Sequence, residues 1–322
     1  MAARKQKVPS STKRPSRLPV RIRLRAILPL FIVILAVYAL LPRLPSFDTS
    51  LTVLRRADVR LVLAAIGCVA ATNVAAALVY KLLVTRPIRY WPMVLIQLAS
   101  SFTNRLLPAG TGAMATSAAY LMKRGHTAAQ AGSIALLNNT LGFIGNILLI
   151  IIIAFLSSTP LGVAMPAHIP VWVWLVLMAV VVMLLVVALW WRRARRVLRE
   201  SLGELARVAR QPWHVMGALA ASMVLTTCFA GALFASAHAV AVHLTFLQAM
   251  YVLTAGVAAV AIAPIPGGIG AAEAGLVAAM VSVGIPPSPA LAVALLYRLV
   301  SFWLPILPGF IGFQIALQKR LV

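Results

Sequence analysis

Three charged residues, Arg105, Glu273 and Arg298, lie inside stretches of sequence that are otherwise apolar. If these stretches enter a membrane, each buried arginine costs about 2.5–3.5 kcal/mol on insertion scales unless it is paired or hydrated. One arrangement is a buried ion pair between Glu273 and Arg298 that holds two segments together without touching a substrate. Arg105 would then bind an anion such as a phosphate group, or its side chain would extend to the cytoplasmic interface.

The motif Pro-x-Gly-x-Gly occurs at 108–112 and again at 266–270, and each copy interrupts an apolar stretch. Matching glycine and proline breaks in two halves of a membrane protein indicate a transport site, because the unwound backbone exposes amides and helix ends to a substrate. Polar residues also gather near the first break. We therefore predict a substrate-binding site that contains Asn104, Arg105, Gly110, Gly112, Gly268, Gly270, Glu273 and Arg298.

Enzymatic chemistry is not expected from this chain. The five histidines are scattered near predicted membrane boundaries, and no carboxylate is spaced to complete a metal site or a catalytic triad with them. Cys68 and Cys228 fall in apolar segments and have no metal-ligand spacing. The sequence therefore predicts a transporter-like protein with no catalytic residues, no metal and no cofactor.

The composition indicates a polytopic integral membrane protein of the all-α class. Of the 322 residues, 62% are hydrophobic and only 11% are charged, so the chain cannot present an ordinary water-soluble surface. The net charge of +24 is spread over the amino-terminal arm and short loops. This distribution favours attraction to the anionic lipids of the inner leaflet and argues against nucleic acid as a partner.

The hydropathy pattern predicts about six full transmembrane helices and two re-entrant or broken-helix hairpins. Residues 1–25 form a disordered basic cytoplasmic arm in this interpretation, and residues 26–322 form a single membrane domain. The hairpins, at 91–122 and 246–283, are the stretches split by the glycine motifs. The full spans are long enough to cross about 30 Å of hydrocarbon and are predicted at 26–41, 61–84, 128–156, 171–191, 213–239 and 290–317.

Charge in the connecting loops predicts the orientation. The loops at 157–170, 240–245 and 284–289 contain no Lys or Arg, whereas the alternate loops and both termini are basic. Because Lys and Arg accumulate in cytoplasmic loops, both termini are expected inside, in the plasma or inner membrane of the cell. The loop at 43–60 carries four arginines and is the exception, so we expect it to lie along the outer interface.

This orientation makes the two hairpins enter from opposite sides. Repeat 1, at about 61–156, and repeat 2, at about 213–317, then become an inverted repeat, in which Gly125 corresponds to Gly284. Inverted repeats provide two near-equivalent shapes that open to opposite sides of the membrane, which is the physical basis of alternating access.

The string Pro-Ile-Pro-Gly-Gly-Ile-Gly-Ala-Ala-Glu at 264–273, followed by Gly284, Arg298, Pro305 and Gly309, resembles the lysylphosphatidylglycerol synthase transmembrane family. The resemblance extends from about residue 25 to the end, and the family includes the flippase part of the multiple peptide resistance factor. It implies a lipid flippase-like integral membrane protein. The aminoacyl-transferase domain of the full synthase does not follow the last predicted span, so we expect no synthesis of aminoacylated lipid here.

The leading hypothesis is a flippase or translocase that moves a phospholipid, aminoacylated or not, or an isoprenoid-linked headgroup between leaflets. The alternative is a membrane subunit or scaffold that transports nothing and presents lipid to a separate transferase of envelope biosynthesis. Assembly as a homodimer is left open by the sequence.

Overall fold

A computed structural model describes residues 56–84, 86–106, 111–156, 203, 206–208, 210–262 and 268–322. Within these ranges the chain forms helices and no strand. The basic arm at 1–25 and the predicted spans at 26–41 and 171–191 lie outside the described residues. Four described segments are long and apolar enough to cross a membrane, namely Val59–Leu83, Ala128–Leu149, Pro212–Ala239 and Pro287–Gln318. The prediction of an all-helical, multi-pass membrane protein is therefore confirmed.

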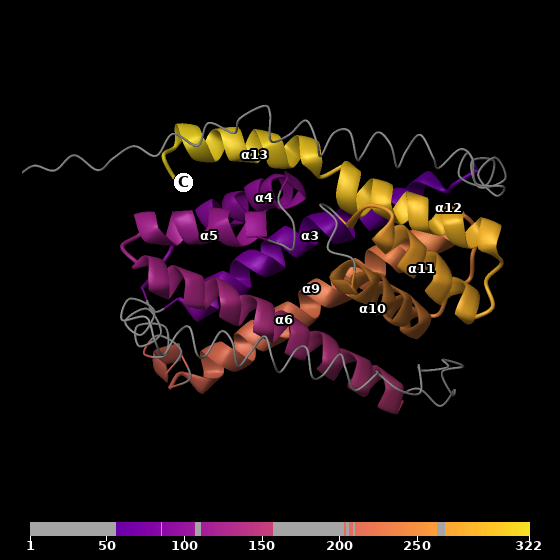
Figure 1. Cartoon of the computed structure of the whole chain (residues 1–322), viewed down its shortest axis with the longest axis horizontal. Coiled ribbons are helices and arrows are strands. Elements are labelled where there is room, and N and C mark those ends of the chain that lie inside the picture. The colour runs from indigo at the N-terminus through magenta and orange to yellow at the C-terminus, as the bar shows by residue number, and fades with distance from the viewer. Residues whose placement is uncertain are drawn as a thin grey trace, which may run out of the picture.

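Two stretches of the chain each combine long helices with a helical hairpin (Figure 1). The first contains α3 (Val59–Leu83), the hairpin of α4 (Tyr90–Leu106) and α5 (Thr111–Lys123), and α6 (Ala128–Leu156). The second contains α9 (Pro212–Ala239), the hairpin of α10 (Phe246–Ile262) and α11 (Ala271–Ser282), and the segment α12 (Pro287–Arg298), η4 (Leu299–Trp303) and α13 (Ile306–Gln318). The predicted spans at 61–84, 128–156 and 213–239 correspond to α3, α6 and α9.

The turns that follow α5 and α11 have the same conformation. Gly125 has φ +89° and Gly284 has φ +90°, a region that glycine adopts without steric cost. In each turn the next amide donates back to the helix, from His126 to the Leu121 carbonyl at 3.2 Å and from Ile285 to the Met280 carbonyl at 3.0 Å. Such a turn satisfies carbonyls that the helix end would leave open.

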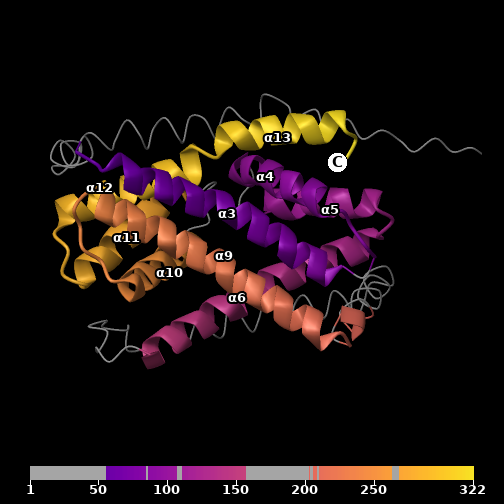
Figure 2. The same ribbon diagram turned by 180° about the vertical axis from the view of Figure 1, so that it is seen from behind.

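The long helices α3 and α9 lie side by side and run antiparallel (Figure 2). At one end, the Asp58 amide at the start of α3 donates to the Ala239 carbonyl at the end of α9 over 2.8 Å. At the other end, Gly217 near the start of α9 faces the side chain of Leu82 near the end of α3. The two hairpins lie toward opposite ends of this helix pair.

Two hydrophobic cores result from this arrangement. The first core surrounds α4 and α5 and includes Met93 and Tyr120, and the second core surrounds α10 and α11 and includes Met250 and Met280. Both α3 and α9 contribute buried residues to the two cores, one half of each helix to each core. The helix pair therefore contributes to both cores along its length.

We expected the last predicted span, at 290–317, to be one continuous helix, but the structure shows a break. It consists of α12, the π-helical segment η4 and α13. Pro305 explains the break, because it has no amide to donate to the carbonyl of Ser301 and its ring crowds that turn. The chain widens instead, and the Leu304 amide donates to the Leu299 carbonyl at 2.8 Å.

The break divides the last segment between the two cores. Residues of α12 such as Val293 belong to the second core, whereas Ala316 of α13 belongs to the first. Gly309 allows α13 to lie directly on α4, since a Cβ atom there would be 3.0 Å from the Leu98 carbonyl oxygen. The π-helical segment is thus the place where this part of the chain passes from one core to the other.

Candidate functional site

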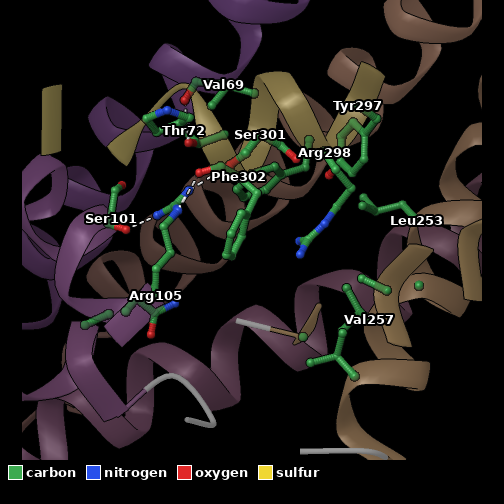
Figure 3. A pocket seen from close by; sticks show the side chains of 18 of the residues that line it. Val69, Thr72, Ser101, Arg105, Leu253, Val257, Tyr297, Arg298, Ser301 and Phe302 are labelled. Carbon is green, nitrogen blue, oxygen red and sulfur yellow. Dashed lines mark hydrogen bonds between the residues drawn. The ribbon is translucent and has the colours of Figure 1, made fainter. Parts of the chain in front are cut away.

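A cavity of about 510 Å³ lies between the two hairpins and is lined by residues of α3, α4, α5, α9, α10, α11 and the end of α12 with η4 (Figure 3). Its walls differ in chemistry. One wall, from α3 and α4, is polar and carries Thr72, Asn73, Gln97, Ser100, Ser101, Asn104 and Arg105. The opposite wall, from α9, α10 and α11, is apolar and carries Leu225, Phe229, Leu253, Val257, Val260 and Leu276.

The part of the polar wall that α4 contributes is one face of this helix. Its residues at 97, 100, 101, 104 and 105 follow the three- and four-residue spacing that places side chains on one side of a helix. Some of these groups bind each other or a neighbouring helix. The side-chain amide nitrogen of Gln97 donates to the Ser117 hydroxyl at 3.3 Å, and the Ser101 hydroxyl donates to the side-chain Oδ1 atom of Asn73 at 3.2 Å.

Glu273 and Arg298 form the ion pair that the sequence allowed. The Nε atom of Arg298 is 2.8 Å from the Oε1 atom of Glu273, and both side chains are largely buried. The second carboxylate oxygen, Oε2, accepts from the Gly270 amide at 2.8 Å. The pair therefore joins the glycine-rich break to the end of α12. Arg298 lines the cavity, whereas Glu273 lies outside its lining.

Arg105 is held by backbone carbonyls. Its Nε atom donates to the Phe302 carbonyl at 2.6 Å and its Nη2 atom donates to the Ser301 carbonyl at 2.9 Å, while Nη1 donates to the Ser101 carbonyl. In a regular helix the Ser301 carbonyl would accept from the amide of residue 305, and Pro305 has no amide hydrogen to donate. The sequence predicted an anion or the cytoplasmic interface as the surroundings of Arg105 and did not predict these carbonyls. The signal for the Ser301 carbonyl was a proline four residues after Ser301.

The side chain of Phe302 contacts both guanidinium groups. The Cζ atom of Arg298 lies 4.2 Å from the ring centroid and that of Arg105 lies 5.0 Å from it, distances at which a cation is attracted to an aromatic ring. Among the described residues, two guanidinium groups and one carboxylate leave one positive charge at this end of the cavity. An unbalanced buried charge of this kind favours an anionic group nearby.

The other predicted site residues lie in different places. Asn104 and Gly268 line the cavity, and Gly268 has φ +61°. Gly112 is buried in α5 with its Cα against the backbone of Thr103, outside the cavity lining. Gly110 lies outside the described residues. In the described ranges, no three His, Cys, Asp or Glu side chains come together in a way that could hold a metal.

A model of the lysylphosphatidylglycerol synthase TM region matches residues 26–309, which is most of the chain. The chain belongs to this family. An 80-residue stretch is also 39% identical to a UPF0104 membrane protein of Pyrococcus horikoshii. That match covers 25% of this chain and 23% of the relative's length. In this member of the lysylphosphatidylglycerol synthase TM family, a cavity with one polar and one apolar wall lies between two helical hairpins.

Proposed function

We propose that this protein moves a lipid between the two leaflets of a membrane, with the headgroup in the cavity and the tail against the apolar wall. The observation that carries the proposal is the division of the cavity into a polar wall on α4 and an apolar wall on α9, α10 and α11. An amphiphile needs both surfaces at once, because a polar headgroup buried without hydrogen bonds is costly and an acyl chain gains nothing from a polar wall.

The charge balance supports a phosphate-bearing lipid as the substrate. Arg105 and Arg298 outnumber Glu273 by one charge beside the polar wall. A phosphodiester would bring one negative charge to this place and would accept hydrogen bonds from guanidinium groups. An isoprenoid-linked headgroup carries the same phosphate chemistry and is included in the proposal.

We infer that transport proceeds by alternating access of an inverted repeat. Three observations support this inference: the first helices of the repeats run antiparallel, the turns at Gly125 and Gly284 are alike, and the hairpins lie toward opposite ends. The break at η4 and Pro305 would serve as the hinge, since α12 belongs to the second core and α13 to the first. Hinges commonly consist of a few residues at element ends.

In the cell, the proposal places the protein in the plasma or inner membrane with both termini in the cytoplasm. Its basic loops would bind the anionic lipids of the inner leaflet. The protein acts here as a transporter and carries out no covalent chemistry on the lipid.

The test is transport by the purified protein in vesicles that contain a fluorescent phospholipid. Dithionite added outside bleaches the outer leaflet only. When the protein is present, we expect nearly all of the fluorescence to disappear, because lipids from the inner leaflet reach the outer one. In vesicles without protein, only the fluorescence of the outer leaflet should disappear. If every phospholipid and isoprenoid-linked lipid tried keeps its leaflet distribution, the proposal is wrong and a lipid-presenting subunit becomes the better description.

A further inference from the structure

Two histidines meet at the end of α9, outside the cavity lining. His238 lies in the last turn of α9, and His243 lies in the short connection at 240–245 that leads to α10. Their ring centroids are 5.7 Å apart, and the ring planes are nearly perpendicular, at 80°. We expected no metal role for the scattered histidines, and a spacing of five residues does not place two side chains on one face of a helix.

The turn after α9 brings the two rings together. The Val242 amide donates to the Ala237 carbonyl at 2.9 Å, so the chain folds back over the helix end. Ala241 has φ +58° in this turn, a conformation that residues other than glycine rarely adopt. The turn therefore returns His243 to the last turn of α9.

The ring of His238 is held in the tautomer that a metal ligand needs. Its Nδ1 atom lies 3.0 Å from the Phe234 carbonyl, and because a carbonyl can only accept, Nδ1 carries the proton. The lone pair of the neutral ring is then on Nε2, which remains accessible to solvent and has no hydrogen-bond partner among the described residues. Histidines that bind a metal almost always donate their other ring nitrogen in this way.

His243 supplies a second ring nitrogen at the same place. Its side chain is exposed and makes no hydrogen bond to any residue that the structure describes. Two imidazoles on one Zn²⁺ have ring centroids about 5–6 Å apart, because each metal–nitrogen bond is about 2.0–2.1 Å long and the bonds diverge at about the tetrahedral angle. The observed separation of 5.7 Å agrees with this value.

The surroundings of the two rings favour a cation. The connection at 240–245 contains no Lys or Arg, and the negative end of the α9 dipole lies at His238. The start of α3 packs beside this helix end and carries the charged residues Arg56, Asp58 and Arg60. The Asp58 carboxylate accepts from the Arg60 amide at 2.8 Å and caps α3, so we do not count it as a ligand.

We propose that His238 and His243 bind one divalent transition-metal ion, such as Zn²⁺, with water completing its coordination. Imidazole nitrogen suits Zn²⁺, Ni²⁺ and Cu²⁺, whereas Mg²⁺ and Ca²⁺ prefer oxygen ligands. The bound ion joins the last turn of α9 to the connection that leads to the second hairpin. This site is separate from the cavity, so the inference goes beyond the proposed function.

The test is isothermal titration calorimetry of the full chain in detergent, purified without a polyhistidine tag. We expect ZnCl₂ to bind with one saturable site per chain and MgCl₂ to give no binding. His238→Ala and His243→Ala should each weaken the Zn²⁺ affinity by at least about 10-fold, since loss of an outer-shell partner alone costs about 10- to 100-fold. The matched control is His214→Ala, which removes an exposed histidine at the opposite end of α9 and should keep the affinity.

Modification of the unaltered protein by diethyl pyrocarbonate provides a second measurement that needs no variant. Mass spectrometry should show that ZnCl₂ protects His238 and His243 from modification and leaves His214 reactive. The inference is overturned if the unaltered protein has no saturable Zn²⁺ site, if His243→Ala binds as well as the unaltered protein, or if ZnCl₂ protects neither ring. Neither measurement involves lipid, so a failure here leaves the proposed transport standing, and a failure of transport leaves this site standing.

Discussion

The two arginines on the cavity wall are stabilised in different ways. Arg298 binds a carboxylate, whereas Arg105 binds the carbonyls of Ser101, Ser301 and Phe302. The carboxylate of Glu273 neutralises the charge of Arg298 and joins the start of α11 to the end of α12. The carbonyls leave the positive charge of Arg105 in place and surround it with backbone dipoles. Arg298 is therefore mainly a structural residue in this state, and Arg105 is the main source of positive potential in the cavity.

Removing one member of the Glu273–Arg298 pair should destabilise the protein strongly. Glu273→Gln leaves an uncompensated buried charge on Arg298, and Arg298→Met leaves one on Glu273. We expect each single variant to lose about 3–5 kcal/mol of stability. The double variant should recover part of this loss, because it buries no unpaired charge. Thermal unfolding of the four proteins in detergent measures the coupling, and additive effects of the two substitutions would contradict a direct pair.

The sequence predicted the ion pair as one of two alternatives, because Glu273 is the acid available beside the second break. It did not predict the partners of Arg105. The carbonyls of Ser301 and Phe302 lie almost two hundred positions along the chain, and the Ser301 carbonyl lacks its helical donor because the helix breaks at Pro305. A charge in the sequence indicates that a partner exists, but backbone carbonyls are the same in every residue, and Pro305 marks only that one carbonyl lacks a helical donor.

At the scale of helices, glycine permits the close contacts within each hairpin. A Cβ atom at Gly112 would lie 2.1 Å from the Thr103 carbonyl oxygen, and one at Gly275 would lie 2.5 Å from the Cβ atom of Ala259. Small residues at helix interfaces are a common means of packing helices in membranes. The glycines of the first motif were predicted to expose amides to a substrate, whereas Gly112 has a packing contact in the structure.

Gly112→Ala should therefore open the first hairpin. The added methyl group meets backbone atoms, which cannot move aside as a flexible side chain can, and we expect a loss of about 1–3 kcal/mol. Gly67→Ala is the control, because a Cβ atom at Gly67 has nothing within 4 Å. Its melting temperature should match or exceed that of the unaltered protein. Equal melting temperatures for Gly112→Ala and Gly67→Ala would show that the contact with Thr103 is absent.

The hydropathy of the sequence located α3, α6 and α9 within a few residues of their observed ends. It missed the division of the last segment, because apolar content stays high through η4 and hydropathy does not register a change from one helical hydrogen-bond pattern to another. Pro305 was visible, but a proline inside an apolar span kinks or breaks a helix in several ways. The direction of the chain after the break depends on contacts with α4, which lie far away in sequence.

At the scale of the whole molecule, the proposed inverted repeat requires the turns after α5 and α11 to face opposite sides of the membrane. These turns lie at opposite ends of the molecule (Figure 1). In a protein with Cys68 and Cys228 replaced by alanine, Arg124→Cys and Pro286→Cys provide one exposed thiol in each turn.

A membrane-impermeant maleimide added to intact cells should label Pro286→Cys, and it should label Arg124→Cys only after permeabilisation. The reason is the basic residues beside the first turn, which favour the cytoplasmic side. Labelling of the denatured proteins is the control for thiol reactivity. If both variants react in intact cells, or neither does, the two turns share a side and the inverted repeat is wrong.

The position of α13 also affects how the protein is made. The first hairpin emerges early from the ribosome, yet the helix that lies on α4 is contributed by residues 306–318. During synthesis, the α4 surface that contacts Gly309 and Gly312 stays uncovered until α13 has been made. A ribosome that stalls before residue 306 would leave a nascent protein whose first core lacks the residues that α13 contributes.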